Sequence, residues 1–176
     1  MGERKETGME MREEGATYVP PGEGHSLIVP AADLITFKWR GEEGDPYSIV
    51  EDATQGPYEG PPPHLHLRQD ESFYVAQGEF VFVVGDREIP GTVGAFVHVP
   101  KGTVHTWRNV GTGIGKLIMT FSPAGDVERF FEEIGEPTTT KTPPTPSTEP
   151  PDPATMEMIL DSAYRNHIRS PPPPGG

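Results

Sequence analysis

The chain has 176 residues, which is enough for one ordinary domain and hardly enough for two. It contains no cysteine, so disulfides, thiolate metal sites and cysteine nucleophiles are excluded. Its formal net charge of −13 argues against nucleic acid and anionic membrane surfaces as partners. We expect a cytoplasmic protein, because no apolar run approaches the roughly 20 residues of a membrane span and the first residues lack the apolar core of a signal peptide.

The two ends of the chain have compositions that cannot fill a hydrophobic core. Residues 1–15 are highly charged and predict a mobile arm that frays or forms a short helix. Eleven of the 22 prolines follow Glu136. Residues 137–153 are rich in Pro and Thr, which predicts an extended linker. We expect residues 170–176 to form a disordered tail.

Residues 154–169 have the apolar spacing of a helix. The apolar positions follow the i, i+3, i+4, i+7 pattern and are Met156, Ile159, Leu160 and Ala163. The linker before this helix is long enough for two arrangements. The helix docks either on its own domain or on a partner subunit.

The middle of the chain, residues 16–136, has the pattern of an all-β domain. Short β-rich runs are separated by Gly, Pro and Asp about every eight to twelve residues, as in sandwiches and barrels. The predicted strands are 26–29, 34–39, 47–52, 63–67, 71–76, 80–84, 95–99, 104–109 and 116–121. Residues 127–134 differ, because Phe130, Phe131 and Ile134 form a helical stripe that can pack on the barrel.

Three histidines and one glutamate are placed so that they can converge. His64 and His66 lie two apart on a predicted strand and so face the same side. Glu71 heads the next strand, and His105 follows the turn at residues 100–102 on a later one. An isolated His-x-His pair is common on surfaces and in cores. Three imidazoles with one carboxylate, however, suit a divalent transition metal better than calcium or magnesium.

The residues around these four side chains form two longer patterns. GPPPHLHLRQDESFYVAQG covers residues 60–78, and GAFVHVPKGTVHTWRN covers residues 94–109. They resemble the two motifs of the cupin superfamily, G-x5-HxH-x3,4-E-x6-G and G-x5-PxG-x2-H-x3-N. The second fits without a gap, whereas the first has three residues instead of five between Gly60 and His64. The resemblance implies a small antiparallel jelly-roll barrel with one or two C-terminal helices.

Within that superfamily the chain looks most like bacterial single-domain cupins related to quercetin 2,3-dioxygenase. The similarity lies in the first motif, in residues 122–135 after the barrel, and in the Pro-rich linker with its last helix. It implies that His64, His66, Glu71 and His105 bind one divalent metal per chain, which is iron, manganese, nickel, copper or zinc. It also implies that Glu71 is the catalytic base that takes a proton from an enolic hydroxyl before dioxygen cleaves the ring. A homodimer is implied as well.

Strand alternation predicts the walls of a small-molecule pocket beside the metal. Phe73 and Val75 share the face of Glu71, and Trp107 shares the face of His105. The further candidates for the lining are Phe82, Phe96, His98, Met119 and Phe121. Such walls would hold an apolar or aromatic ligand. The simpler alternative is that these side chains are ordinary core, since burial is the default for Phe and Val.

Two other functions fit the same residues. A non-catalytic cupin would bind a metal and a small ligand without oxygen uptake. A metal-dependent isomerase or decarboxylase acting on a polar acid usually needs several basic pocket residues, and residues 16–121 contain only seven Lys or Arg. No basic stripe precedes the barrel, which disfavours a DNA-reading regulator.

Overall fold

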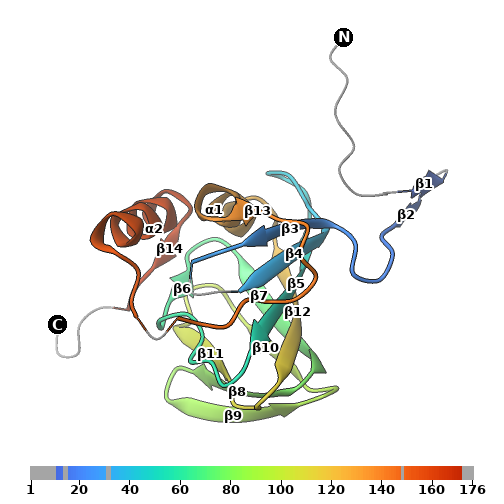
Figure 1. The fold of residues 1–176 in the computed structure, drawn as a ribbon. Coiled ribbons are helices and arrows are strands. Elements are labelled where there is room, and N and C mark those ends of the chain that lie inside the picture. Colours follow the sequence, from blue (N-terminus) through green and yellow to red (C-terminus); the bar gives the residue numbers. More distant parts are fainter. Residues whose placement is uncertain (1–10, 14–15, 31–32, 148, 172–176) are drawn as a thin grey trace.

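The larger sheet of the protein contains seven antiparallel strands. The structure, a computed structural model, describes residues 11–13, 16–30, 33–147 and 149–171 (Figure 1). In spatial order the strands of this sheet are β10 (Phe96–Val99), β7 (Asp70–Gln77), β12 (Ile114–Ser122), β5 (Ser48–Gln55), β4 (Leu34–Trp39), β3 (His25–Ile28) and β13 (Glu136–Pro137).

Smaller sheets complete the barrel and its surroundings. Three strands lie in the order β11 (His105–Asn109), β8 (Glu79–Val84) and β9 (Arg87–Thr92). Two short strands, β14 (Ile168–Arg169) and β6 (Leu65–His66), pair with each other, as do β1 (Met11–Glu13) and β2 (Ala16–Tyr18). An isolated bridge between His64 and His105 joins the β6 segment to β11.

The core lies inside the barrel because the strands alternate between inward apolar and outward polar residues. Along β12, Leu117, Met119 and Phe121 are buried and the residues between them are only partly so. Along β7, Phe73 and Val75 are buried in the same way. Each such side chain contributes roughly 1.5–3 kcal/mol to folding through its burial. The same alternation places Glu71 on the inward face of β7.

The observed strands match the predicted ones closely in position. Each of the predicted runs overlaps one strand, and β5 continues beyond the predicted end at Asp52 to Gln55. Strand β9 was missed, because Pro90 and Gly91 within it are typical strand breakers. The protein is therefore mostly β with antiparallel sheets, as the sequence predicted.

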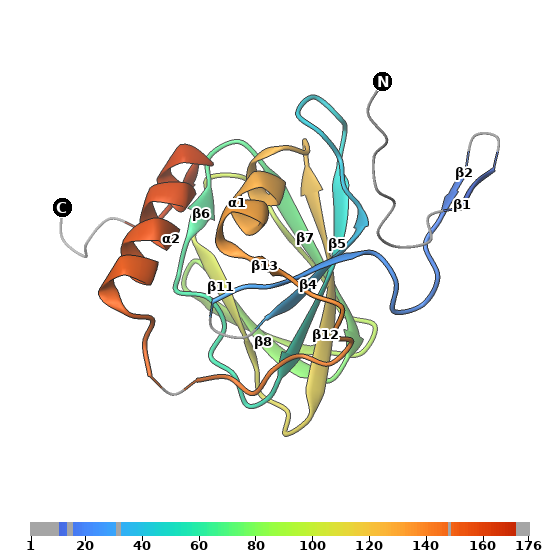
Figure 2. The same ribbon diagram turned by 45° about the horizontal axis from the view of Figure 1, so that its top comes forward.

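Two helices cover one end of the barrel. Helix α1 (Asp126–Ile134) follows β12, and α2 (Pro153–Arg165) lies beside it (Figures 1 and 2). Asp152 caps α2, since its Oδ1 accepts hydrogen bonds from the backbone N–H groups of Ala154 and Thr155. Of the two arrangements open for this helix, the structure describes the one in which it docks on its own chain.

The segment after α2 returns to the barrel as a strand. The helix was expected to reach residue 169 but ends at Arg165, and His167 then has a φ of 60°. This turn lets β14 pair with β6, with Ile168 opposite His66. Strand β14 is thereby placed next to His66, one of the predicted metal ligands.

The structure describes only parts of the predicted arm and tail at the two ends of the chain. Residues 1–10 of the predicted arm and 172–176 of the predicted tail lie outside the described residues. Within that arm, Met11–Glu13 pairs with β2, a pairing that the sequence did not predict. Among the described residues, none of the helices combines the length and the apolar character needed to cross a membrane.

Candidate metal centre

Four side chains meet at one point on the inner wall of the barrel. His64, His66, Glu71 and His105 each offer one ligand atom, and these atoms all lie within 4.8 Å of one another. Glu71, His66 and His105 are buried, and His64 is partly buried. The structure thus brings together the residues that the sequence predicted as ligands.

Backbone pairing holds the segments that carry these ligands. The backbone N–H of His64 donates to the carbonyl of His105 at 3.0 Å, and the N–H of His105 donates back at 2.8 Å. Gly102 donates to the carbonyl of His66 at 2.7 Å. At Gly60, with a φ of +71°, a Cβ would lie 1.7 Å from the carbonyl oxygen of Trp107, so only glycine permits the loop before His64 to approach β11 this closely.

Hydrogen bonds orient the imidazole rings. His64 Nδ1 lies 3.0 Å from the carbonyl of Pro62, and His105 Nδ1 lies 2.9 Å from the carbonyl of Thr103. Since a carbonyl only accepts, both Nδ1 atoms carry the proton, and Nε2 is the atom left to bind a metal. His66 Nε2 and His105 Nε2 face Glu71 Oε2 at 3.0 and 2.8 Å.

The charges of the cluster suit a cation. Burial lowers the pKa of His64 to about 3, helped by the neighbouring His105 and His66, so this imidazole is neutral at physiological pH. Burial opposes ionisation of Glu71, but hydrogen bonds from His105 and His66 outweigh it and hold the pKa of that carboxyl well below its usual range. Burial likewise opposes protonation of His105, and Glu71 outweighs it and raises the pKa of that imidazole. The ionised carboxylate of Glu71 beside a neutral His64 gives the cluster a negative charge that a cation would balance.

The donor set fits a divalent transition metal. Three imidazole nitrogens and one carboxylate oxygen are ligands of iron, manganese, nickel, copper and zinc, and they offer too few oxygens for calcium. His66 Nδ1 is buried and has no hydrogen-bond partner among the described residues. The ligand atoms of the four residues lie within 4.8 Å of one another, with His66 Nε2 and His105 Nε2 beside Glu71 Oε2, so the cluster could hold a metal ion.

Comparisons with known proteins agree with this picture. Residues 53–121 match the family model described as a cupin domain. Quercetin 2,3-dioxygenase of Bacillus subtilis (strain 168) is 34% identical over 74 residues, which are 42% of this chain and 21% of that protein. The match thus spans about a fifth of the relative's length.

Some solved structures have a partly similar fold. KdgF from Halomonas sp. superposes with a TM-score of 0.52 at 20% identity, over 58% of this chain and 88% of that one. Pac13 from Streptomyces, a nucleoside dehydratase, gives a TM-score of 0.47 at 16% identity, over 65% and 84% of the two chains. The likeness to KdgF is one of fold, and the match of residues 53–121 to the cupin domain agrees with the two motifs in the sequence.

A cavity of about 350 Å³ opens beside the ligand cluster. His64, His66 and Glu71 form part of its wall. Of the predicted pocket residues, Trp107, Met119 and Phe121 line it. The cavity is therefore mostly apolar on the side that faces the barrel core.

The other predicted pocket residues do not line this cavity. Phe73, Val75 and Phe82 point inward but are packed into the barrel core, where the Phe73 ring lies 6.0 Å from that of His105. The assignments of Phe96 and His98 were wrong. Phe96 is 64% exposed, and His98 is exposed and hydrogen-bonded to Ser72 Oγ at 3.0 Å. The inward residues of β10 are Val97 and Val99 instead.

The helical end of the cavity was not predicted from the sequence. Helix α1 contributes Val127, Phe130 and Phe131, and α2 with the residues after it contributes Ile159, Leu160, Ala163, Tyr164 and Ile168. The apolar stripes of both helices were visible in the sequence, but nothing local shows that they face the metal ligands.

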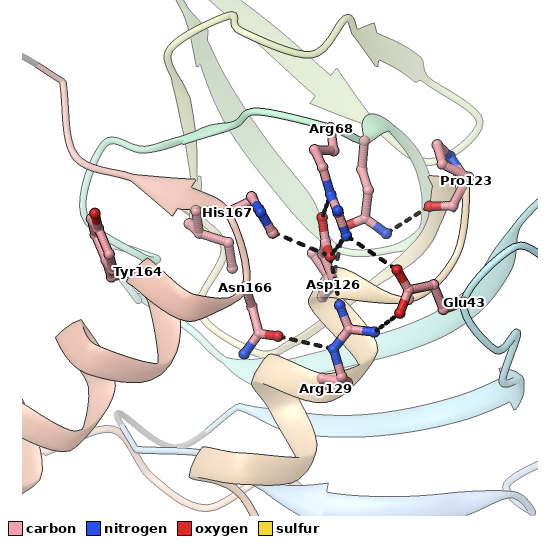
Figure 3. A network of polar contacts seen from close by, with 12 residues as sticks. Glu43, Arg68, Pro123, Asp126, Arg129, Tyr164, Asn166 and His167 are labelled. Atoms are coloured by element: carbon pink, nitrogen blue, oxygen red, sulfur yellow. Dashed lines mark hydrogen bonds and ion pairs between the residues drawn. The ribbon is translucent and has the colours of Figure 1, made fainter.

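A network of ion pairs fixes this helical end (Figure 3). Arg68, in the loop after His66, binds Asp126 of α1 through Nε at 2.9 Å and Nη2 at 2.5 Å. Arg129 donates to Asp126 at 2.8 Å and to Asn166 at 3.2 Å. Since Asn166 caps α2, the network connects both helices to the loop that follows β6.

Two polar residues of the cavity wall were also missed. Asp33 and Asp52 line the same cavity and are only 8% and 4% exposed. The sequence did indicate the position of Asp52. It lies two residues after Val50 on a β-rich run, so its side chain is expected to face the interior with that of Val50. A charged residue at such a position is rarely buried without a reason.

Proposed function

We propose that the protein is a metal-dependent dioxygenase that cleaves a flavonol-like or other enolic small molecule. The convergence of His64, His66, Glu71 and His105 within 4.8 Å at the wall of an apolar cavity carries this proposal. The likeness to quercetin 2,3-dioxygenase of Bacillus subtilis, over 42% of the chain, supports the choice of reaction. The metal, when bound, would act as a Lewis acid that polarises a substrate oxygen. Homodimerisation and a cytoplasmic location stay predictions.

The residues of the chain suit the remaining steps. Glu71 is ionised at neutral pH, since its pKa lies below the usual range, and it is therefore in the form that can accept the enolic proton. A low pKa makes a carboxylate a weak base, so the base role rests on the position of Glu71 in the cavity wall and not on its pKa. Its side chain is only 4% exposed and lies in the cavity wall, where a bound ligand can reach it. Trp107, Met119 and Phe121 offer apolar surface to an aromatic body beside it.

Oxygen uptake tests the proposal. Protein purified without an affinity metal is loaded with each candidate ion and mixed with flavonols and smaller enols. We expect uptake for the wild type, and we expect Glu71→Gln to keep much of its metal while losing turnover by roughly 10²–10⁴-fold. The matched control is Glu88→Gln, because Glu88 is exposed and pairs with Arg108.

The outcomes separate the possible functions. Unchanged turnover in Glu71→Gln refutes the role of Glu71 as base. Metal at near one per chain without oxygen uptake from any substrate refutes the dioxygenase. That result indicates instead a cupin that binds its ligand without cleaving it, or one that catalyses a reaction without oxygen.

A further inference from the structure

Two carboxylates outside the ligand cluster share its cavity. Asp33 lies just before β4, and Asp52 lies on β5 directly opposite Ile35 in the antiparallel register. Asp33, Ile35 and Asp52 all line the cavity, together with His66 and Glu71. The cavity therefore has a second polar region, separate in sequence from the metal ligands.

These carboxylates lack the partners that burial demands. Among the described residues, Asp33 Oδ1 and Asp52 Oδ1 are buried and accept no hydrogen bond. Asp33 Oδ2 accepts one from the Tyr58 hydroxyl at 3.0 Å. A buried carboxylate without partners is unfavourable by several kcal/mol. A bound ligand that donates hydrogen bonds to these oxygens would explain why both carboxylates lie in the cavity wall.

The protonation of the pair indicates which kind of donor it suits. Burial raises the pKa of Asp33 to about 7, against the opposing hydrogen bond from Tyr58. Burial, followed by the charges of Asp33, Glu71 and Glu51, raises the pKa of Asp52 well above its usual range. At neutral pH the pair therefore carries less than its full negative charge. A pair in this state favours a neutral hydroxyl over an ammonium ion.

We propose that Asp33 and Asp52 form a polar subsite that binds a hydroxyl group at the far end of a small aromatic ligand. The choice of ligand rests on the proposed function, in which the near end of the ligand is held at the His64, His66, Glu71 and His105 cluster. Ile35 and Trp107 lie in the same cavity wall and give the aromatic body an apolar contact. Tyr58 positions Asp33 through its hydrogen bond and packs on Trp107 at 5.8 Å between ring centroids.

Two flavonols that differ in one hydroxyl test the subsite. Galangin has an unsubstituted phenyl ring, and kaempferol carries one hydroxyl on it. Binding is measured under nitrogen by quenching of Trp107 fluorescence in a Trp39→Phe background, since the chain has two tryptophans. A hydrogen bond to a carboxylate is worth about 1.5–3 kcal/mol, so we expect the wild type to bind kaempferol roughly 10- to 100-fold more tightly than galangin.

Isosteric variants assign that preference to the carboxylates. We expect Asp33→Asn and Asp52→Asn to reduce the preference to within about 3-fold, because the hydrogen bond loses its charged acceptor. Their affinity for galangin and their metal content stay at the wild-type level. Asp86→Asn is the matched control, since Asp86 is exposed in the turn between β8 and β9. If one of the two variants fails to fold, the other still reports on the pair.

Three results would overturn the subsite: equal affinity of the wild type for the two flavonols, no quenching by either, or a preference that survives in the variants that fold. Oxygen uptake by the same samples reports separately on the proposed function. A hydroxyl preference without uptake refutes the dioxygenase and leaves the subsite. Oxygen uptake without a preference for kaempferol refutes the subsite and leaves the dioxygenase.

Discussion

The carboxylates inside the barrel respond to burial in opposite ways. Glu71 receives hydrogen bonds from two imidazoles, which hold its pKa below the usual range despite burial. Asp33 has a single hydrogen bond from Tyr58, and burial raises its pKa to about 7. Between pH 4 and pH 7 the native protein therefore binds a proton at Asp33 that the unfolded chain does not. Raising the pH from 4 to 7 therefore lowers the contribution of Asp33 to the free energy of unfolding.

Asp33→Asn is expected to remove that loss of stability. We subtract the free energy of unfolding of the wild type from that of the variant. This difference should increase by at most about 4 kcal/mol between pH 4 and pH 7 and stay constant at higher pH. Urea unfolding at a series of pH values measures this difference. Asp86→Asn, at an exposed position, should run parallel to the wild type. Parallel curves for Asp33→Asn too would show that the Asp33 pKa is not raised.

At the scale of elements, α2 and β14 act as one cover over the cavity. Ile159 and Ala163 pack against the core cluster, and the backbone N–H of Leu67 donates to the carbonyl of His167 at 2.9 Å. Arg129 joins the end of α2 to Asp126 of α1 (Figure 3). Glu133 of α1 also accepts hydrogen bonds from Ser162, Arg165 and Asn166. Helix α2 is therefore held by these polar contacts together with the apolar face that it buries.

A charge on that face should detach the helix without unfolding the barrel. We expect Ile159→Asp to speed amide hydrogen exchange throughout α2 and β14, while β5, β7 and β12 keep their protection. Met158→Asp is the matched control, because Met158 is the neighbouring residue and is 42% exposed. Mass spectrometry of peptides after exchange resolves the two segments. Unchanged exchange in α2 of Ile159→Asp would mean that this face does not hold the helix.

The elements also show what sequence reasoning can reach. The metal ligands were predictable because each lies in a local pattern with fixed spacing, such as the alternation of His64 and His66. Asp52 was the last residue of the predicted strand 47–52. The observed strand β5 continues to Gln55 because it pairs with β4 and β12. Strand β14 has two residues and exists only because β6 is beside it. The length of β5 and the existence of β14 depend on such distant pairings, which the local sequence does not show.

At the scale of the whole molecule, the helices and the ligand cluster lie toward the same end of the barrel. Figure 1 shows α1, α2 and β14 at that end and β8 with β9 at the other. Trp107, Met119 and Phe121 reach the cavity from the barrel, and both helices close it from outside. The cavity is thus built by the domain and its C-terminal segment together. A ligand bound there would stabilise both, because binding to the native state alone raises the free energy of unfolding.

The central claim is that His64, His66, Glu71 and His105 bind one divalent transition metal. The most direct measurement is elemental analysis of the untagged protein after loading with each candidate ion and extensive dialysis. We predict close to one iron, manganese, nickel, copper or zinc per chain for the wild type, and close to none for His66→Ala and His105→Ala, which remain folded by circular dichroism. A wild-type protein that retains none of these ions, or alanine variants that retain as much as the wild type, would contradict the account.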